Sequence, residues 1–197
     1  MAHHTRDPFR VLISTMISLR TKDEVTLPAS KRLFAVADDL AGIIALEEGE
    51  IEKLIYPAGF YRTKARSIKK VARIIAEQYG GRVPNSVGEL TTLPGVGRKT
   101  ANLVLNLGFG LPAICVDTHV HRISNRFGWV ATKTPDQTEL ALAAILPQHH
   151  WIEINELLVG YGQKICAPLS PRCSECPFIG LDAGTPRCAR IGVDRSR

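Results

Sequence analysis

A lysine and an aspartate are the two side chains of this sequence whose placement best suits covalent chemistry. Lys99 directly follows the glycine-containing run LPGVGR at 93–98, and Asp117 stands in the short run VDTH at 116–119. A neutral lysine amine is a nucleophile that attacks electrophilic carbon and forms Schiff bases. An ionised carboxylate close by can stabilise a cationic intermediate or help to deprotonate the amine or an attacking water. The pair therefore predicts an enzyme that works through a covalent intermediate.

The glycine-containing run predicts a turn between two helices that binds phosphate. Gly95 and Gly97 allow backbone conformations closed to other residues, and they let a phosphate come close on either side of Val96. The next helix is expected to begin at about Arg98, where unpaired N–H groups and the helix dipole favour an anion. The same dipole, with partial burial in a cleft, disfavours the charged form of the Lys99 amine.

A plain tight turn between helices is the alternative reading of this run. The adjacent cations Arg98 and Lys99 and the net charge of +6 favour contact with a polyanion instead. A turn of this kind grips a nucleic-acid backbone without reading its sequence. Asp117 stands where the cap of a following helix is expected, and N–H donors there keep a carboxylate ionised. Taken singly, the lysine would be a surface residue and the aspartate a plain helix cap, but their joint placement favours a reaction centre.

The elements that position these residues are predicted to be helices. Apolar residues recur at helical spacing, segments of strict alternation are absent, and 45% of the residues are hydrophobic, so we expect an all-α fold with a packed core. Pro8 suits a helix start, Asp23 and Ser86 suit helix caps, and no apolar run reaches the ~18 residues of a membrane span. We expect a soluble, intracellular (cytoplasmic) protein. The clearest predicted helices cover about 8–20, 23–37, 63–79, 136–146 and 149–164.

Five cysteines form two groups. Cys115 lies in an apolar run and is expected in the core. The other four crowd the last part of the chain as C-x6-C-x2-C-x11-C, a clustering that favours a metal site over disulfides in an intracellular protein. Four thiolates suit either zinc or a [4Fe-4S] cluster, and the spacing alone leaves both open. These four are Cys166, Cys173, Cys176 and Cys188.

LPGVGRKTA at 93–101 and VDTH at 116–119 resemble the helix-hairpin-helix DNA glycosylases of the endonuclease III family. The resemblance runs from DPF at 7–9 to the last cysteine. It implies a bifunctional DNA glycosylase and AP lyase of base-excision repair that removes oxidised pyrimidines from duplex DNA. Lys99 would be the nucleophile and Asp117 its assistant. A lysine here also separates the chain from relatives that only remove a base, such as adenine-DNA glycosylases.

The resemblance also implies how DNA is held. The target nucleotide must leave the duplex stack, and side chains must fill the gap. Phe60 in GFY at 59–61 would be an apolar wedge, with core packing as the alternative. Arg20 stands where bacterial relatives usually have glutamine and would pair with the orphaned base. His119 would line the cleft or contact phosphate, unless it is a structural histidine. The hairpin residues Gly95, Val96, Gly97 and Arg98 would hold the backbone.

For the cysteines, the resemblance favours a [4Fe-4S] cluster over zinc. Cys166, Cys173 and Cys176 have the family spacing, whereas the gap before Cys188 is longer than usual. A three-cysteine site or a labile cluster therefore stays open beside ligation by all four. The cluster would be structural, holding a basic loop with Arg172 against DNA.

Two lobes are expected, with DNA across the mouth between them. A helical barrel at 22–129 would carry the hairpin at about 86–108, and residues 1–21 plus 130–197 would form the cluster domain. Six cations between 62 and 73 would form a basic helix face, either solvated or bordering DNA. The protein is expected to be a monomer. Two other functions stay open: a monofunctional mismatch glycosylase that uses water, and a non-enzymatic DNA-binding module stabilised by zinc or a cluster.

Overall fold

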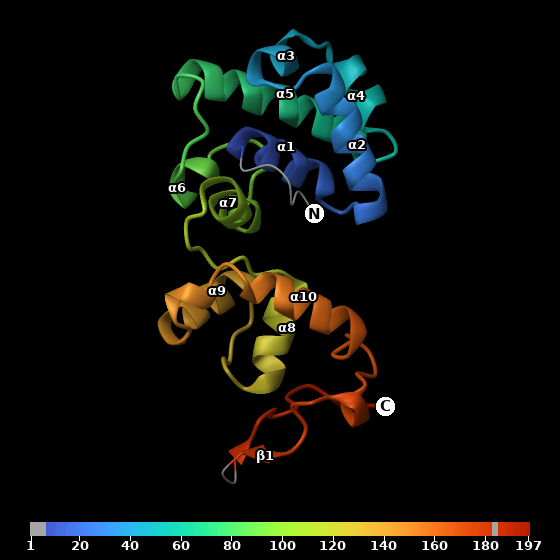
Figure 1. Cartoon of the computed structure of the whole chain (residues 1–197), viewed down its shortest axis with the longest axis vertical. Coiled ribbons are helices and arrows are strands. Elements are labelled where there is room, and N and C mark those ends of the chain that lie inside the picture. The colour runs from blue at the N-terminus through green and yellow to red at the C-terminus, as the bar shows by residue number, and fades with distance from the viewer. Residues whose placement is uncertain (1–6, 183–184) are drawn as a thin grey trace. The chain divides into compact units, whose positions relative to one another are not determined.

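The computed structural model describes residues 7–182 and 185–197, and it is helical, as predicted. The chain forms two compact units, Met1–Leu111 and Pro112–Arg197. Figure 1 shows the first unit as the helices from α1 to α7 and the second as those from α8 onward. No helix within the described ranges is both long and apolar enough to cross a bilayer.

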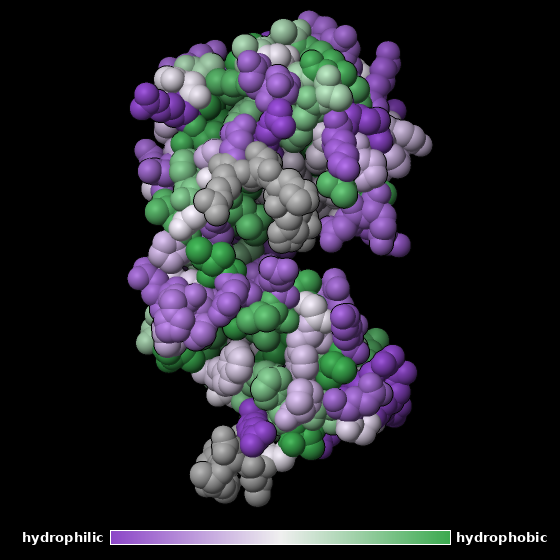
Figure 2. All heavy atoms as spheres, in the orientation of Figure 1, coloured by the Kyte–Doolittle hydropathy of each residue, from purple (hydrophilic) through white to green (hydrophobic). Residues whose placement is uncertain are grey.

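The first unit is built around its N-terminal helix. Val11, Leu12, Ile13 and Ile17 are fully buried, because α1 contacts α2, α5, α7 and η1. Figure 1 shows this helix between α5 and α7. Hydrophilic and hydrophobic side chains alternate over the visible surface of the unit (Figure 2). The helices of this unit are α1 (Pro8–Ser18), α2 (Asp23–Val36), α3 (Leu40–Ala45), α4 (Glu48–Ile55), α5 (Tyr61–Gln78), α6 (Val87–Leu90), α7 (Arg98–Val104) and the π-helix η1 (Leu105–Phe109).

The division of the chain differs from the predicted lobes. The prediction grouped residues 1–21 with 130–197, whereas α1 belongs to the compact unit that ends at Leu111. The physical reason is the buried apolar face of α1, which packs on the neighbouring helices of that unit. Residues 112–129 likewise belong to the second unit, because α8 packs on α9 and α10.

Polar caps define several of the helix starts. Asp7 accepts a hydrogen bond from the backbone N–H of Phe9 at 2.9 Å, and Pro8 occupies the first helical position of α1. Ser86 caps α6 by accepting from Glu89 N at 3.2 Å, as predicted. Asp23 is not a cap, because it is already the first residue of α2 and Lys22 precedes it without a capping hydrogen bond.

The second unit packs its helices around α8. Its core includes Val120, Ile123, Phe127 and Leu142. The helix predicted at 149–164 is shorter, since a 3-10 turn comes first and the α-helix begins at Ile154. The elements are α8 (Thr118–Phe127), α9 (Pro135–Ile145), η2 (Gln148–His150), α10 (Ile154–Lys164), η3 (Cys173–Glu175), and the two-residue strands β1 (Leu181–Asp182) and β2 (Thr185–Pro186), which pair antiparallel.

Candidate active site and DNA interface

The two glycines of the turn before α7 have different backbone conformations. Gly95 has a φ of +80°, a left-handed conformation that glycine adopts without strain. Gly97 is the N-cap of α7 with a φ of −93°, and an added Cβ there would meet no atom within 4 Å. The prediction that both glycines serve an unusual backbone is therefore wrong for Gly97. Its lack of a side chain leaves open space at the start of α7.

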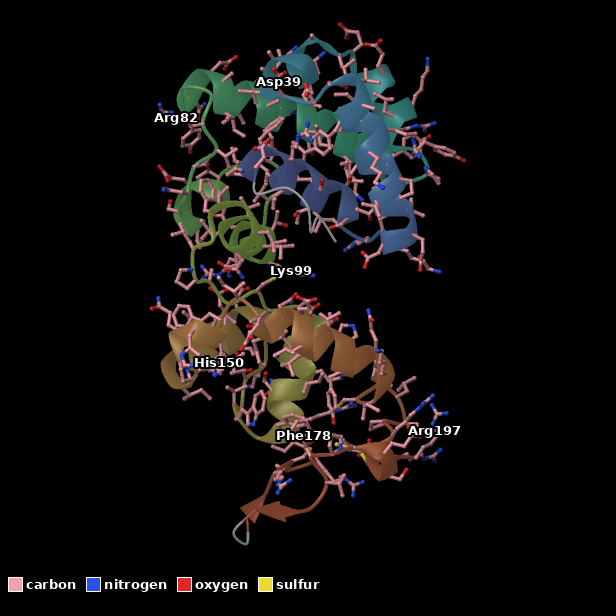
Figure 3. All side chains as sticks on the ribbon, in the orientation of Figure 1. Asp39, Arg82, Lys99, His150, Phe178 and Arg197 are labelled. Atoms are coloured by element: carbon pink, nitrogen blue, oxygen red, sulfur yellow. The ribbon has the colours of Figure 1, made fainter. Side chains whose placement is uncertain are left out.

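Lys99 lies in the first turn of α7 and is exposed, and Figure 3 shows its side chain extending from that helix. The expected partial burial is not seen, because the buried face of α7 is formed by Thr100, Ala101 and Val104. Leu103 lies one turn further along, so it shares a helix face with Lys99. The amine is thus presented at the surface of the first unit, beside the turn.

Asp117 caps α8, as predicted. Its carboxylate accepts hydrogen bonds from the backbone N–H groups of His119 at 2.8 Å and Val120 at 3.0 Å. Two donors fix the orientation of this half-buried carboxylate and compensate its negative charge. Asp117 is thereby a rigid anionic group at the start of a helix.

His119 is engaged in a side-chain network that the sequence did not reveal. Its Nδ1 lies 3.1 Å from Arg122 Nη2, which also donates to the Cys166 carbonyl at 2.8 Å. Arginine is only a donor, so Nδ1 is the acceptor and the neutral ring carries its proton on Nε2. A Cβ at Gly162 would lie 2.3 Å from His119 Nδ1. Gly162 in α10 therefore leaves room for the side chains of His119 and Arg122. In the sequence, only the helical periodicity of α8 and α10 could have suggested this contact.

Arg20 and Phe60 lie side by side in the first unit. Both have left-handed backbones, with φ of +53° and +58°, and the guanidinium carbon lies 5.6 Å from the ring centroid. Phe60 is 62% exposed, which rules out the core-packing alternative. A Cβ at Gly59 would stand 2.8 Å from the Arg20 carbonyl oxygen, so the two turns touch through their backbones.

The predicted basic face of α5 is smaller than expected. Lys64 and Lys69 are buried, at 8% and 6% exposure. Burial lowers the pKa of Lys64 to about 8. Both lysines fall on the apolar face with Ala65 and Ile68, a helical register that could have identified them. The exposed cations of the helix are Arg62, Arg66, Lys70 and Arg73.

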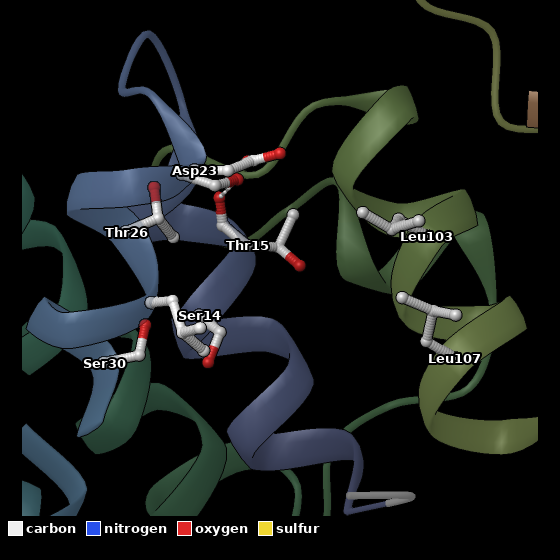
Figure 4. A pocket seen from close by; sticks show the side chains of 9 residues that line it. Ser14, Thr15, Asp23, Thr26, Ser30, Leu103 and Leu107 are labelled. Carbon is white, nitrogen blue, oxygen red and sulfur yellow. Dashed lines mark hydrogen bonds between the residues drawn. The ribbon is translucent and has the colours of Figure 1, made fainter. Parts of the chain in front are cut away.

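A pocket of about 100 Å³ opens between α1, α2 and the α7–η1 segment (Figure 4). Leu103 and Leu107 form one wall, on the helix face that carries Lys99. Among the described residues, the Ser30 hydroxyl is buried here without a hydrogen-bond partner. The pocket therefore combines apolar walls with an unsatisfied polar atom. Its lining residues are Ser14, Thr15, Ser18, Asp23, Thr26, Leu27, Ser30, Leu103 and Leu107.

The four clustered cysteines line one pocket of the second unit, and all of them are free thiols. Arg126, which is 7% exposed, donates to Cys166 Sγ at 3.4 Å and to the Ala167 carbonyl at 2.7 Å. The Tyr161 hydroxyl lies 2.7 Å from Cys176 Sγ. Within residues 7–182 and 185–197, no three His, Cys, Asp or Glu side chains stand in the geometry that ligates a single metal ion. Cys115 is fully buried, as predicted.

Aromatic side chains close one side of this cysteine pocket. The Phe178 ring lies 5.3 Å from Phe127 and 5.7 Å from Tyr161 between centroids, and Figure 3 labels its place in the second unit. Burial raises the pKa of Tyr161, and its contact with Cys176 raises it further, so the phenol stays neutral. Burial also raises the pKa of the Cys188 thiol.

The sequence and the fold define a class of protein. Residues 13–148 match the model of the HhH-GPD superfamily of base excision DNA repair proteins. The chain is 53% identical to endonuclease III of Thermotoga maritima over 88% of this chain and 82% of that protein. It is 45% identical to endonuclease III-like protein 1 of Bos taurus over 89% of this chain, and it spans 61% of that longer relative.

Solved structures agree with these relatives. A trapped covalent endonuclease III–DNA intermediate superposes with a TM-score of 0.82 at 37% identity, covering 90% of this chain and 86% of that one. A thermostable thymine-DNA glycosylase gives a TM-score of 0.81 at 30% identity, covering 94% and 87%. This chain therefore belongs to the endonuclease III family within the HhH-GPD superfamily.

Proposed function

We propose that this chain is a bifunctional DNA glycosylase and AP lyase that removes oxidised pyrimidines from duplex DNA inside cells. The observation that carries the proposal is the placement of Lys99, an exposed amine in the first turn of α7 directly after an open glycine turn. The covalent endonuclease III–DNA structure supports it, because a trapped covalent intermediate requires a nucleophile on that protein.

In the proposed reaction, the Lys99 amine attacks C1′ of the extruded nucleotide. The bond between C1′ and the base breaks, and the base leaves with the electron pair and gains a proton. The C1′–O4′ bond then breaks and O4′ gains a proton, so the opened sugar becomes an iminium ion joined to Lys99. This ion loses a proton from C2′, and the C3′–oxygen bond breaks with the electron pair leaving on the oxygen, which cuts the strand on the 3′ side. Asp117 is proposed as the second catalytic residue, because a carboxylate fixed by two backbone donors is suited to stabilise positive charge on the sugar.

DNA binding is assigned to groups with distinct tasks. The backbone N–H groups at Gly95, Gly97 and Arg98 would hold a phosphate, since Gly97 leaves the start of α7 open. Val96 would support this contact by fixing the turn, because its N–H donates to the Leu93 carbonyl at 3.1 Å. Phe60 and Arg20 would enter the duplex beside the extruded nucleotide. His119, already bonded to Arg122, would contribute its Nε2 proton to a phosphate oxygen.

The pocket between α1, α2 and α7 is the proposed receptor for the extruded base. Leu103 and Leu107 provide apolar walls for the faces of a pyrimidine ring, and the Ser30 hydroxyl offers an unused hydrogen-bonding group. Because Leu103 lies one turn after Lys99 on the same helix face, the amine stands near the mouth of this pocket.

A [4Fe-4S] cluster is the proposed resident group of the second unit. The residues fit it in chemistry: four free thiols line one pocket, and the buried guanidinium of Arg126 donates to Cys166 Sγ, which suits a thiolate. Cys166, Cys173, Cys176 and Cys188 would hold the cluster. Bound there, it would act as a structural cross-link between the end of α10 and the C-terminal segment that carries the other three cysteines. Iron analysis and visible absorption of the purified protein test this assignment.

Strand cleavage tests the proposed function. A lyase cuts a duplex bearing an oxidised pyrimidine without added base or heat, because β-elimination is part of the enzyme reaction. A monofunctional glycosylase that uses water leaves an abasic strand that breaks only on alkaline treatment. Release of the base with an intact strand would support that alternative, and an unchanged duplex would support a binding module.

A further inference from the structure

Two turns of the first unit are joined by one buried amine. The 18–21 turn follows α1 and carries Arg20, and the 59–61 turn precedes α5 and carries Phe60. The Lys64 Nζ donates to the carbonyl oxygens of Ile17 and Leu19 at 2.6 Å each, and to Thr21 Oγ1 at 2.8 Å. The amine thus gives its three N–H bonds to three acceptors of the 18–21 turn and the end of α1.

The connection continues across to the second turn. Thr21 Oγ1, which accepts from Lys64, also accepts from the backbone N–H of Gly59 at 3.0 Å. Lys64 closes the first turn of α5, where its backbone N–H donates to the Phe60 carbonyl at 3.0 Å. The amine and the threonine hydroxyl therefore bond the two turns to each other, through main-chain and side-chain groups.

Both turns hold their exposed side chain on a strained backbone. Arg20 and Phe60 have positive φ, a conformation that side-chain-bearing residues keep only where surrounding contacts fix it. The fixing contacts here are those of Lys64 and Thr21. Without them, each turn would relax toward ordinary backbone conformations, and the guanidinium would no longer stand over the ring.

We propose that Lys64 is a positioning residue that locks Arg20 and Phe60 into one preformed unit, which enters damaged DNA as a whole. This inference rests on the proposed function. A preformed pair loses little conformational freedom on insertion, whereas two independent loops would each have to be ordered by the DNA. The stacked guanidinium would meet the orphaned base while the ring fills the gap left by the extruded nucleotide.

The test compares two buried lysines of α5. Lys64→Met removes the three N–H donors of the amine and nearly keeps the length of the side chain. Lys69→Met is the matched control, because Lys69 is equally buried on the same helix but bonds to Leu46 and Glu47, away from both turns. Dissociation constants are measured for a duplex with a tetrahydrofuran abasic analogue opposite 2-aminopurine, and for the undamaged duplex. The fluorescence of 2-aminopurine reports side-chain entry next to it.

The inference predicts that Lys64→Met weakens binding to the abasic analogue about tenfold, the scale of one lost stacking contact, and suppresses the fluorescence change. Binding to undamaged duplex should be unchanged, since the hairpin contacts are intact. Lys69→Met should retain both the affinity and the fluorescence change. Equal weakening on both duplexes, or no weakening by Lys64→Met in a folded protein, would overturn the inference.

Thr21→Val supplies a milder route if Lys64→Met lowers stability too far. It removes the hydroxyl that Lys64 and Gly59 share and leaves the amine its two carbonyl acceptors. Thr21→Val should likewise weaken binding to the abasic analogue and leave binding to undamaged duplex unchanged. The double variant Thr21→Val and Phe60→Ala should bind the analogue no more weakly than Phe60→Ala alone. Additive losses would contradict action through Phe60. A wild-type protein that fails to prefer the analogue over undamaged duplex would instead refute the proposed function.

Discussion

Gly95 and Gly97 stand in the same turn, but their φ angles have opposite signs, +80° and −93°. The fold requires glycine only at position 95. Substitutions at the two positions therefore distinguish an effect on folding from an effect on DNA contact. Gly97→Ala should change the free energy of unfolding little, because the restriction that alanine places on the unfolded chain offsets its poorer fit at the N-cap of α7. It should weaken binding to any duplex, since the methyl group obstructs the phosphate.

Gly95→Ala is the matched comparison for this prediction. Alanine at a positive φ is strained, so this variant should lose about 1 kcal/mol of unfolding free energy. Denaturant unfolding and salt-dependent DNA binding measure the two effects. Normal DNA affinity in Gly97→Ala would contradict phosphate contact at this turn.

Gly162 and Gly160 offer a second pair on one helix. A Cβ at Gly162 would lie 2.3 Å from His119 Nδ1 and 2.9 Å from Arg122 Nη2, whereas Gly160 has nothing within 4 Å. Gly162→Ala should cost about 1–3 kcal/mol through overpacking, and Gly160→Ala should gain up to ~1 kcal/mol through helix propensity. Thermal unfolding of both variants checks the direction. Equal melting temperatures would mean that His119 and Arg122 can move aside freely.

A substitution in the pocket between α1, α2 and α7 should slow base release without slowing strand cleavage. Ser14→Leu adds a bulky side chain to a lining position, so it should slow base release by at least ~10-fold, the scale of a misplaced substrate. Cleavage at a preformed abasic site should be nearly unchanged, since no base needs the pocket. Single-turnover rates on a damaged duplex and on an abasic duplex measure the two. Equal slowing of both would place the base elsewhere.

Lys64 should make stability depend on alkaline pH. Burial lowers its pKa in the folded protein to about 8, against an ordinary value of 10.5. Between these values the unfolded chain binds a proton that the folded protein lacks, so the unfolding free energy contributed by Lys64 rises with pH. The free energy of unfolding of wild type should therefore rise relative to that of Lys64→Met between about pH 8 and pH 10.5. Parallel pH profiles would show that the lysine is not desolvated.

Local patterns in the sequence predicted the helices and several caps. Asp117 and Ser86 were found because capping depends on residues close in sequence, and the all-α fold follows from helical periodicity. The helical register of Lys64 with Ala65 and Ile68 could have indicated its burial, but its hydrogen-bond acceptors at Ile17, Leu19 and Thr21 could not be predicted because they lie far away in the sequence. Gly97 was misinterpreted because glycine spacing does not reveal φ. The boundary at Leu111 likewise depends on tertiary packing of α1.

The most direct test of the account is borohydride trapping on a duplex with an oxidised pyrimidine. A Schiff base between Lys99 and the sugar would be reduced to a stable covalent protein–DNA adduct, visible as a band of lower mobility. Wild type and Lys53→Gln, which changes an exposed lysine of α4, should form the adduct equally well. Lys99→Gln should form none while still binding the duplex. Trapping by Lys99→Gln at the wild-type level would contradict the assignment of Lys99 as the nucleophile.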